Sequence, residues 1–246
     1  MKKTAKLLSL AVALFAGLSG TAQAEGFKVG ADVVSSYVWR GGELGDSPAI
    51  QPAFSYTFPG CGVIVGAWGS YALSDNTISL TNPNKKYRYQ EVDLYATVPV
   101  GPFSLTLIDY YVPDTTLDPS PRTFDFSKDS FNVIEANIVY AKDNLSLFAA
   151  INIAGNKGNA IDGTNGTEHA KYFEAGYKFY EKDGYTAKGV VGIGDEDYYG
   201  DQYLVGKNNN IALVNTGISV SKDRYTASYI YNPDTEKSNL VFMASF

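Results

Sequence analysis

Hydrophobic and polar residues alternate along most of the chain beyond residue 25. A period of two is typical of a β-strand that shows unlike environments on its two faces. In residues 89–99, one face carries Val92, Leu94, Ala96 and Val98, and the other carries Glu91, Asp93, Tyr95 and Thr97. Residues 144–153 and 171–180 alternate in the same way. The pattern predicts an all-β protein in which each strand separates an apolar from a polar side.

Short polar turns divide this pattern into strands. They lie at 59–61, 100–101, 142–143, 182–184 and 222–223, and longer polar loops lie between them. Gly, Asn and Asp favour tight hairpins because they tolerate positive φ angles. We predict twelve strands, at 27–40, 49–58, 62–71, 89–99, 102–111, 130–140, 144–153, 171–180, 184–194, 210–220, 224–232 and 237–246.

Strand length and loop order both indicate a membrane barrel. The turns repeat about every 40 residues, as in a β-propeller, but each repeat holds two strands of about ten residues, too long for a blade. Tilted strands of about 9–11 residues span a bilayer, and short turns alternate with long loops in outer-membrane barrels. We therefore expect an antiparallel up-and-down transmembrane β-barrel of about 12 strands.

Periodicity alone also fits a soluble barrel of the lipocalin kind, with its apolar face inward. Two observations favour the membrane. The chain holds 19 Tyr and 13 Phe, and tyrosines gather near strand ends, as in the aromatic belts at membrane interfaces. Twelve strands also exceed the number in small soluble ligand barrels.

Both ends of the chain support export to the outer membrane. Residues 1–24 have a basic start, an apolar run from Leu7 to Leu18 and the small-x-small site Ala22-Gln23-Ala24, which predicts a cleaved signal peptide. Residues 25–246 would form the barrel. The chain ends on Phe246 after apolar residues at every second position, a pattern that resembles the signal recognised by the barrel assembly machinery.

Several stretches resemble one family of outer-membrane proteins. They are "ADVVSSYVWRGGELGDSPAIQPAFSYTF" (31–58), "GVIVGAWGSYALSD" (62–75) and "EVDLYATV" (91–98). These stretches resemble the TorF-type family of outer-membrane porins, closely over the first third of the barrel and more loosely afterwards. The resemblance implies a 12-stranded barrel in the outer membrane of a Gram-negative bacterium.

Charge and residue types exclude several functions. Without the three lysines of residues 1–24, the chain has 17 Lys and Arg against 26 Asp and Glu, a net charge of −9, which argues against nucleic-acid binding. The single His169 has no nucleophile motif beside it, so we expect no enzyme and no cofactor. Residues 194–201 hold four carboxylates without the spacing of a calcium loop, so we expect no dedicated metal site.

The polar strand faces provide the candidate functional residues. Charges inside a membrane pair with one another or line water, so they indicate either a pore lining or an internal plug, with Arg40 opposite a carboxylate. The candidate pore-lining residues are Lys28, Asp32, Arg40, Glu91, Asp93, Glu135, Glu174, Lys178 and Lys188.

Two functions fit these features. The first is a narrow, modestly acidic passive channel for small solutes or ions, since twelve strands leave less room than the 16–18 of wide porins. The second is a closed barrel whose outer loops bind a ligand, a lipid or a partner protein. Either would contact outer-membrane lipid and lipopolysaccharide.

Overall fold

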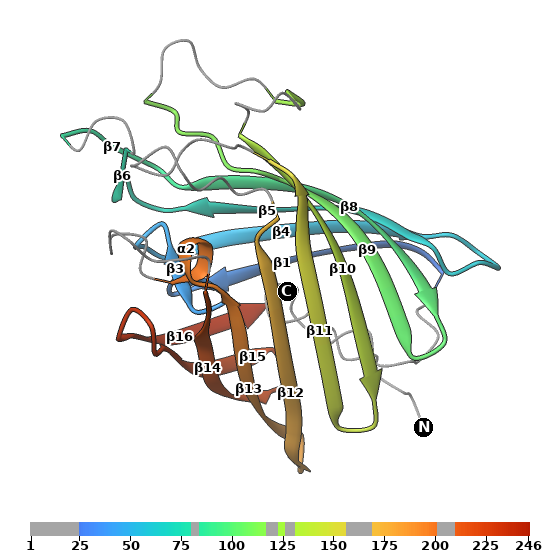
Figure 1. Cartoon of the computed structure of the whole chain (residues 1–246). Helices are drawn as coiled ribbons and strands as arrows, with labels where there is room; N and C mark the ends of the chain where they lie inside the picture. The colour runs from blue at the N-terminus through green and yellow to red at the C-terminus, as the bar shows by residue number, and fades with distance from the viewer. Residues whose placement is uncertain (1–24, 80–83, 117–122, 126–130, 156–168, 201–209) are drawn as a thin grey trace.

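The computed structural model describes residues 25–79, 84–116, 123–125, 131–155, 169–200 and 210–246. Twelve antiparallel strands of this part of the chain close into one barrel (Figure 1), which confirms the predicted fold class. The barrel strands are β1 (Gly26–Val34), β4 (Ala49–Thr57), β5 (Ile64–Ala72), β8 (Gln90–Val100), β9 (Phe103–Tyr111), β10 (Asn132–Lys142), β11 (Leu145–Ala154), β12 (Lys171–Lys182), β13 (Tyr185–Asp195), β14 (Ile211–Lys222), β15 (Tyr225–Asn232) and β16 (Lys237–Ser245).

Each barrel strand pairs with the strands before and after it along the barrel, and β1 pairs with β16 to close the ring. The tight turns lie where the sequence predicted them, and they use left-handed backbone. Asp143, Asp183 and Asp223 have φ angles of 54°, 51° and 54°. Aspartate tolerates this region because its short side chain can hydrogen-bond locally. The turn residues therefore fix the strand boundaries at one end of the barrel, here called the turn end; the other end is the loop end.

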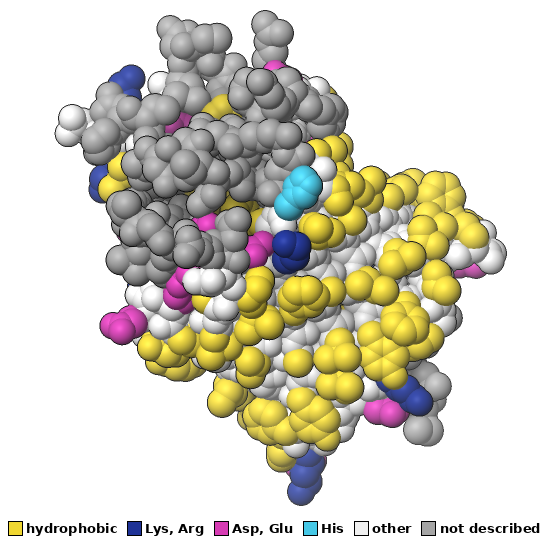
Figure 2. All heavy atoms as spheres, in the orientation of Figure 1, with side chains coloured by type: hydrophobic (Ala, Val, Ile, Leu, Met, Phe, Trp, Pro, Cys, Tyr) yellow, Lys and Arg dark blue, Asp and Glu magenta, His cyan; other side chains and the backbone are white. Residues whose placement is uncertain are grey.

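The barrel is apolar outside and polar inside. Hydrophobic side chains cover the barrel wall that faces the viewer in Figure 2, and charged side chains lie toward its ends. Phe27 and Val29 are 71% and 74% exposed on the outer face, whereas Gln51 and Glu135 are 1% and 0% exposed on the inner face. A soluble ligand barrel would show the reverse, so this arrangement is that of a membrane barrel.

Exposed aromatic rings gather at the turn end of the wall. They are Phe27, Phe103, Tyr177, Phe179, Tyr180, Tyr185, Tyr225 and Phe246. Such a belt is expected where a barrel meets the interface between lipid and water. No helix of the described residues is long and apolar enough to cross a membrane.

The seam between β1 and β16 is the shortest in the barrel. It has three paired positions, from Asp32–Ser245 to Val34–Met243, whereas the other eleven seams have 7 to 11. Backbone bonds between Ala31 and Phe246 extend it at one end, and bonds of Ser35 with Phe242 extend it at the other. The C-terminal phenylalanine thus takes part in closing the barrel.

The first strand is shorter than predicted. It ends at Val34 instead of residue 40, and the chain then forms a small hairpin of β2 (Tyr37–Trp39) and β3 (Gly42–Leu44), separate from the barrel sheet. A second hairpin, β6 (Thr77–Ile78) with β7 (Lys86–Tyr87), and a short helix, α2 (Glu196–Tyr199), lie in the loops at the other end from the tight turns. The long loops therefore lie where the sequence predicted them, but they contain short strands and a helix that were not predicted.

The pairing of β9 runs without a shift, including at Tyr110 and Tyr111 beside Asp109. The irregular positions lie instead at Ile134/Glu135, Lys178/Tyr180 and Gly192/Ile193. Asp109 is half-buried and accepts hydrogen bonds from Asn132. The signal peptide predicted at 1–24 lies outside the described residues.

Candidate functional site

The segment between β1 and β4 folds into the barrel instead of extending its wall. We call residues 35–48, which include β2 and β3, the plug hairpin. Its Tyr37 ring packs on Trp68 of β5 at 5.4 Å between ring centroids, and its Trp39 packs on Tyr110 of β9 at 5.8 Å. Its tip reaches β10, the fifth strand from β1 around the ring. The hairpin therefore crosses the lumen in the half of the barrel near the long loops.

Arg40 at the tip of the plug hairpin makes the central contact. Its two terminal nitrogens donate to the two carboxylate oxygens of Glu135 at 2.7 and 2.9 Å. The side chains of Arg40 and Glu135 are 3% and 0% exposed. Nη1 also donates to the Tyr199 hydroxyl at 2.7 Å. A bidentate pair of this kind joins the plug hairpin to the far wall by strong, directional hydrogen bonds.

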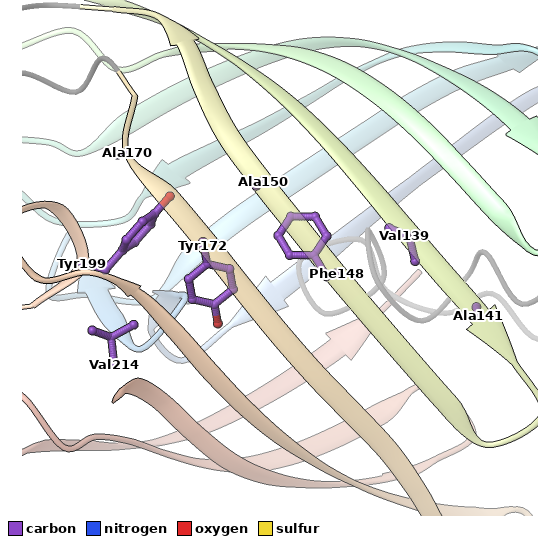
Figure 3. Close-up of a cluster of buried hydrophobic side chains, with 8 residues drawn as sticks. All are labelled: Val139, Ala141, Phe148, Ala150, Ala170, Tyr172, Tyr199 and Val214. Carbon is purple, nitrogen blue, oxygen red and sulfur yellow. The ribbon is translucent and has the colours of Figure 1, made fainter. Parts of the chain in front are cut away.

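Four aromatic rings surround the Arg40 guanidinium. The distances from Cζ to the ring centroids are 4.4 Å for Trp39, 4.8 Å for Tyr172, 5.0 Å for Phe148 and 5.5 Å for Tyr199. Figure 3 shows Phe148 and Tyr172 on the neighbouring strands β11 and β12, with Tyr199 close to Tyr172. Each such contact attracts a cation, and more strongly where water is excluded. These four rings, here called the aromatic cage, stabilise the charged form of Arg40 in the lumen.

A close backbone approach fixes the hairpin from a third side. Gly41 has a φ of +87°, and a Cβ built on it would lie 1.9 Å from the carbonyl oxygen of Val214 on β14. Only glycine fits here, both for its backbone angle and for the lack of space. Helix α2 supports the same region, because Asn232 donates to the Tyr199 carbonyl at 3.1 Å. The plug hairpin thus contacts several strands around the ring.

A second group of polar residues lies beside Tyr37. The Tyr89 hydroxyl donates to Glu91 at 2.7 Å, and Asp93, two residues further on the same inward face, pairs across the sheet with Trp68. Glu91 and Asp93 are 5% and 2% exposed. The two carboxylates lie side by side on the inner wall, as their positions in the sequence predicted.

On the turn side of the plug hairpin, a cavity of about 90 Å³ remains in the lumen. Its lining includes Trp39 of the plug hairpin at the loop side, Glu174 and Lys188 on β12 and β13, and Asn215 on β14. Asn215 donates to Glu174 at 2.9 Å and to the Tyr172 hydroxyl at 3.0 Å. This cavity brings two predicted residues, Glu174 and Lys188, into one site.

The structure places all nine candidate residues inside the barrel or at its edge. Arg40 is the exception to the predicted location, because it lies on the plug hairpin and not on a wall strand; its expected pairing with a carboxylate is confirmed. Lys178 lies near the turn end of β12 and pairs with Glu181. The buried members are Asp32, Arg40, Glu91, Asp93 and Glu135, and the half-buried members are Lys28, Glu174, Lys178 and Lys188. Their role in lining a pore stays a prediction.

The loops at the far end from the tight turns hold polar contacts of their own. Ser79 donates to Asp114 at 2.7 Å. Burial, and then the Asp114 charge, raise the pKa of Tyr87 to about 12. His169 is exposed, has a φ of 71° and donates its backbone N–H to Asn152. Among the described residues no group of His, Cys, Asp and Glu is arranged to hold a metal.

Sequence reasoning missed the aromatic cage and Asn215. Tyr172, Phe148 and Tyr199 come from three separate strands and loops, and their sequence spacing carries no sign of a common contact. The available signal was the run Trp39-Arg40-Gly41-Gly42, in which paired glycines indicate a tight turn directly after Arg40, at the end of the predicted strand. A turn there would have placed Arg40 at a hairpin tip.

Comparisons with known proteins identify the family of this chain. The family model described as "Bacterial protein of unknown function (Gcw_chp)" matches residues 20–238. No protein with a curated description matches the sequence.

Two solved structures show similarity at low levels. The monoaromatic hydrocarbon channel TodX, as a deltaS2S3 mutant, is 12% identical with a TM-score of 0.34, over 89% of this chain and 76% of that chain. The outer-membrane protease OmpT from Escherichia coli is 10% identical with a TM-score of 0.23, over 90% of each chain. Similarity at this level carries no argument about the activity of this chain.

Proposed function

The chain belongs to the Gcw_chp family of bacterial proteins, and we propose that it is a narrow channel of the Gram-negative outer membrane. In this proposal the barrel passes small solutes or ions, and the plug hairpin closes its outer half. The tight turns and both termini face the periplasm, and the long loops face the outside. The resemblance of residues 31–58, 62–75 and 91–98 to the TorF-type porins supports the same function.

The observation that carries the proposal is that, among the described residues, the plug hairpin of one loop crosses a lumen whose wall is polar. The plug hairpin is joined to the wall through β1 and β4 and crosses to Glu135 on β10. On its turn side the inner wall is polar, with Thr57, Thr97, Thr106 and Ser228 buried on inward faces. A purely structural barrel does not need such a wall, because apolar side chains would fill the interior more stably.

The charge of the inner wall favours cations. Arg40 and Glu135 neutralise each other. Three further buried carboxylates, Asp32, Glu91 and Asp93, and the half-buried Glu174 lie on inner faces, against three half-buried lysines, Lys28, Lys178 and Lys188. Rings of acidic side chains select for cations in other channels. An open barrel of this chain should therefore conduct cations better than anions.

A second function is favoured by the strength of the closure. The Arg40–Glu135 pair lies in a cage of four rings and is almost fully buried. Removing one partner of a buried pair typically costs about 3–5 kcal/mol. A plug held this firmly also fits a permanently closed barrel that presents its outer loops to a partner, to lipid or to lipopolysaccharide.

Single-channel recording in planar bilayers distinguishes the two functions. The plug-deleted variant replaces residues 36–47 by a short Gly-Ser linker. Its matched control replaces residues 74–86 of another long loop, which include β6 and the first residue of β7. Heat-dependent gel migration verifies that each sample is a folded barrel. We expect brief openings from the wild type, steady cation-selective current from the plug-deleted variant, and wild-type behaviour from the control. A folded, plug-deleted barrel that carries no current would reject the channel.

A further inference from the structure

The cavity on the turn side of the plug hairpin is lined mainly by apolar atoms, but it also contains two side chains of opposite charge. Val38 and Trp39 of the plug hairpin and Val190 and Ile230 of the wall supply apolar surface. Glu174 and Lys188 enter the cavity from adjacent strands, and Ser219 lies on the same lining. An apolar pocket with a few converging polar groups is typical of a small-molecule site.

Lys188 reaches across the wall without finding a bonded partner. A Cβ on Gly176 would lie 2.6 Å from the Lys188 Cε and 3.1 Å from its Nζ, so the side chain lies over the bare backbone of Gly176 and leans along the sheet toward the level of Glu174. Among the described residues, no hydrogen bond or salt bridge to Lys188 Nζ is found, and the Glu174 charge on the adjacent strand acts on it only from a greater distance. A half-buried ammonium group without a bonded partner would be stabilised by a bound anionic group.

The opposite side of the cavity has unused acceptors. The Oε2 atom of Glu174 accepts from Tyr172 and Asn215, at 2.7 and 2.9 Å, and these contacts leave Oε1 available. Asn215 is 7% exposed, and its buried Oδ1 has no hydrogen-bond partner. A buried acceptor without a donor costs free energy. Glu174 Oε1 and Asn215 Oδ1 together would satisfy an ammonium group, which has three donors and no acceptor.

We propose that this cavity binds a small zwitterion, namely an α-amino acid with a short side chain. Its carboxylate pairs with Lys188, its ammonium group donates to Glu174 and Asn215, and its side chain contacts Val38, Trp39 and Ile230. The cavity volume of about 90 Å³ is smaller than the roughly 150 Å³ of an engineered cavity that binds benzene. A compound with a short side chain fits this space, and a bulky one does not.

This inference deepens the proposed channel by naming the solute class that it would select, but binding is measured without any current. A barrel that binds the zwitterion and never conducts would reject the channel and leave the site standing. A barrel that conducts without binding it would reject the site and leave the channel standing.

Tryptophan fluorescence gives a direct test, because the chain has two tryptophans and Trp39 lines the cavity. In a Trp68→Phe background the folded barrel is titrated with L-alanine, with propionate, which lacks the ammonium group, and with ethylamine, which lacks the carboxylate. We expect saturable binding of L-alanine at millimolar concentration, and at least tenfold weaker binding of the other two. Losing one charged hydrogen-bond partner accounts for about that factor.

Variants of the two charged residues locate the site. Lys188→Met and Glu174→Gln should each weaken L-alanine binding at least about tenfold. The matched control is Lys178→Met, which removes the lysine that lies opposite Lys188 in the sheet but pairs with Glu181 and lies outside the cavity lining, and should leave binding unchanged. Saturation-transfer NMR of the unmutated protein with the three compounds repeats the comparison if a variant fails to fold.

The proposal fails if L-alanine gives no saturable signal with a folded barrel, which would mean that the cavity holds water only. It also fails if propionate binds as tightly as L-alanine, because the site would then recognise an anion through Lys188 alone. Equal loss of binding in Lys178→Met and Lys188→Met would likewise reject a specific role for the cavity.

Discussion

Replacing Arg40 by methionine should detach the plug hairpin from the barrel wall. Methionine keeps an unbranched, flexible side chain in the aromatic cage but removes the charge, and Glu135 then stays buried at 0% exposure without a cation. An uncompensated buried charge costs about 3–5 kcal/mol. If that cost fell entirely on the closed state, the ratio of open to closed barrels would rise roughly 150- to 4,000-fold.

Two signals measured together follow the release. Urea is added to the barrel folded in lipid vesicles, tryptophan fluorescence reports the plug region through Trp39 and Trp68, and far-UV circular dichroism reports the barrel. In the wild type the two transitions should coincide. In Arg40→Met the fluorescence transition should move to lower urea while the circular dichroism transition moves less, and single-channel current should rise in parallel.

The double variant Arg40→Met/Glu135→Leu separates the buried charge from lost packing. Removing both charges leaves neither of them buried alone, so the double variant should be more stable than Arg40→Met alone. A double variant as unstable as Arg40→Met would refute the reasoning. The control is Arg88→Met, whose pair with Asp75 is exposed at 37% and 59% and should be worth less than about 1 kcal/mol.

Three further predictions concern the hairpin, the outer wall and the C-terminus. Gly41→Ala should displace the plug hairpin, since its Cβ would lie 1.9 Å from Val214 O; increased protease cleavage within residues 35–48 would show this, and cleavage at the wild-type rate would contradict it. Leu107→Arg, on an outward position that is 50% exposed, should lower the unfolding free energy in bilayers by about 2–4 kcal/mol, and an unchanged value would mean that lipid does not contact this wall. Deleting Phe246 should reduce the amount of heat-modifiable barrel in the outer membrane, because Phe246 bonds to Ala31 at the seam; a normal amount would show that assembly does not depend on this residue.

The barrel could be predicted from the sequence because its signals are local. Turn residues such as Asp183 and Gly184, the period of two and the strand lengths each constrain a few neighbouring residues, and together they set twelve strands. Strand limits agree with the structure to within about two residues, apart from the first strand. Inward faces of β8 and β12 followed directly from alternation, so Glu91, Asp93 and Glu174 were placed on the correct side.

The plug hairpin could not be predicted in the same way, because its cause is not local. Residues 35–40 include the β-favouring run Tyr37-Val38-Trp39 directly after β1, which reads as a continuing strand. Their position depends on Glu135, Tyr172 and Tyr199, more than ninety residues away. The cage exists only when distant strands meet around the ring. Such contacts are set by closure of the barrel, which the periodicity of a single segment does not contain.

The short seam between β1 and β16 has a consequence for how the barrel is made and undone. The chain's first and last strands meet over three paired positions, because the plug hairpin leaves the wall at Ser35. In the described part of the chain, the pairing of β16 with β1 therefore does not extend to Ser238 and Leu240. During folding the barrel should close last at the seam between β1 and β16, and during unfolding it should open there first. Hydrogen exchange at the Val33 and Ala244 amides should therefore be the fastest among the paired residues of the barrel.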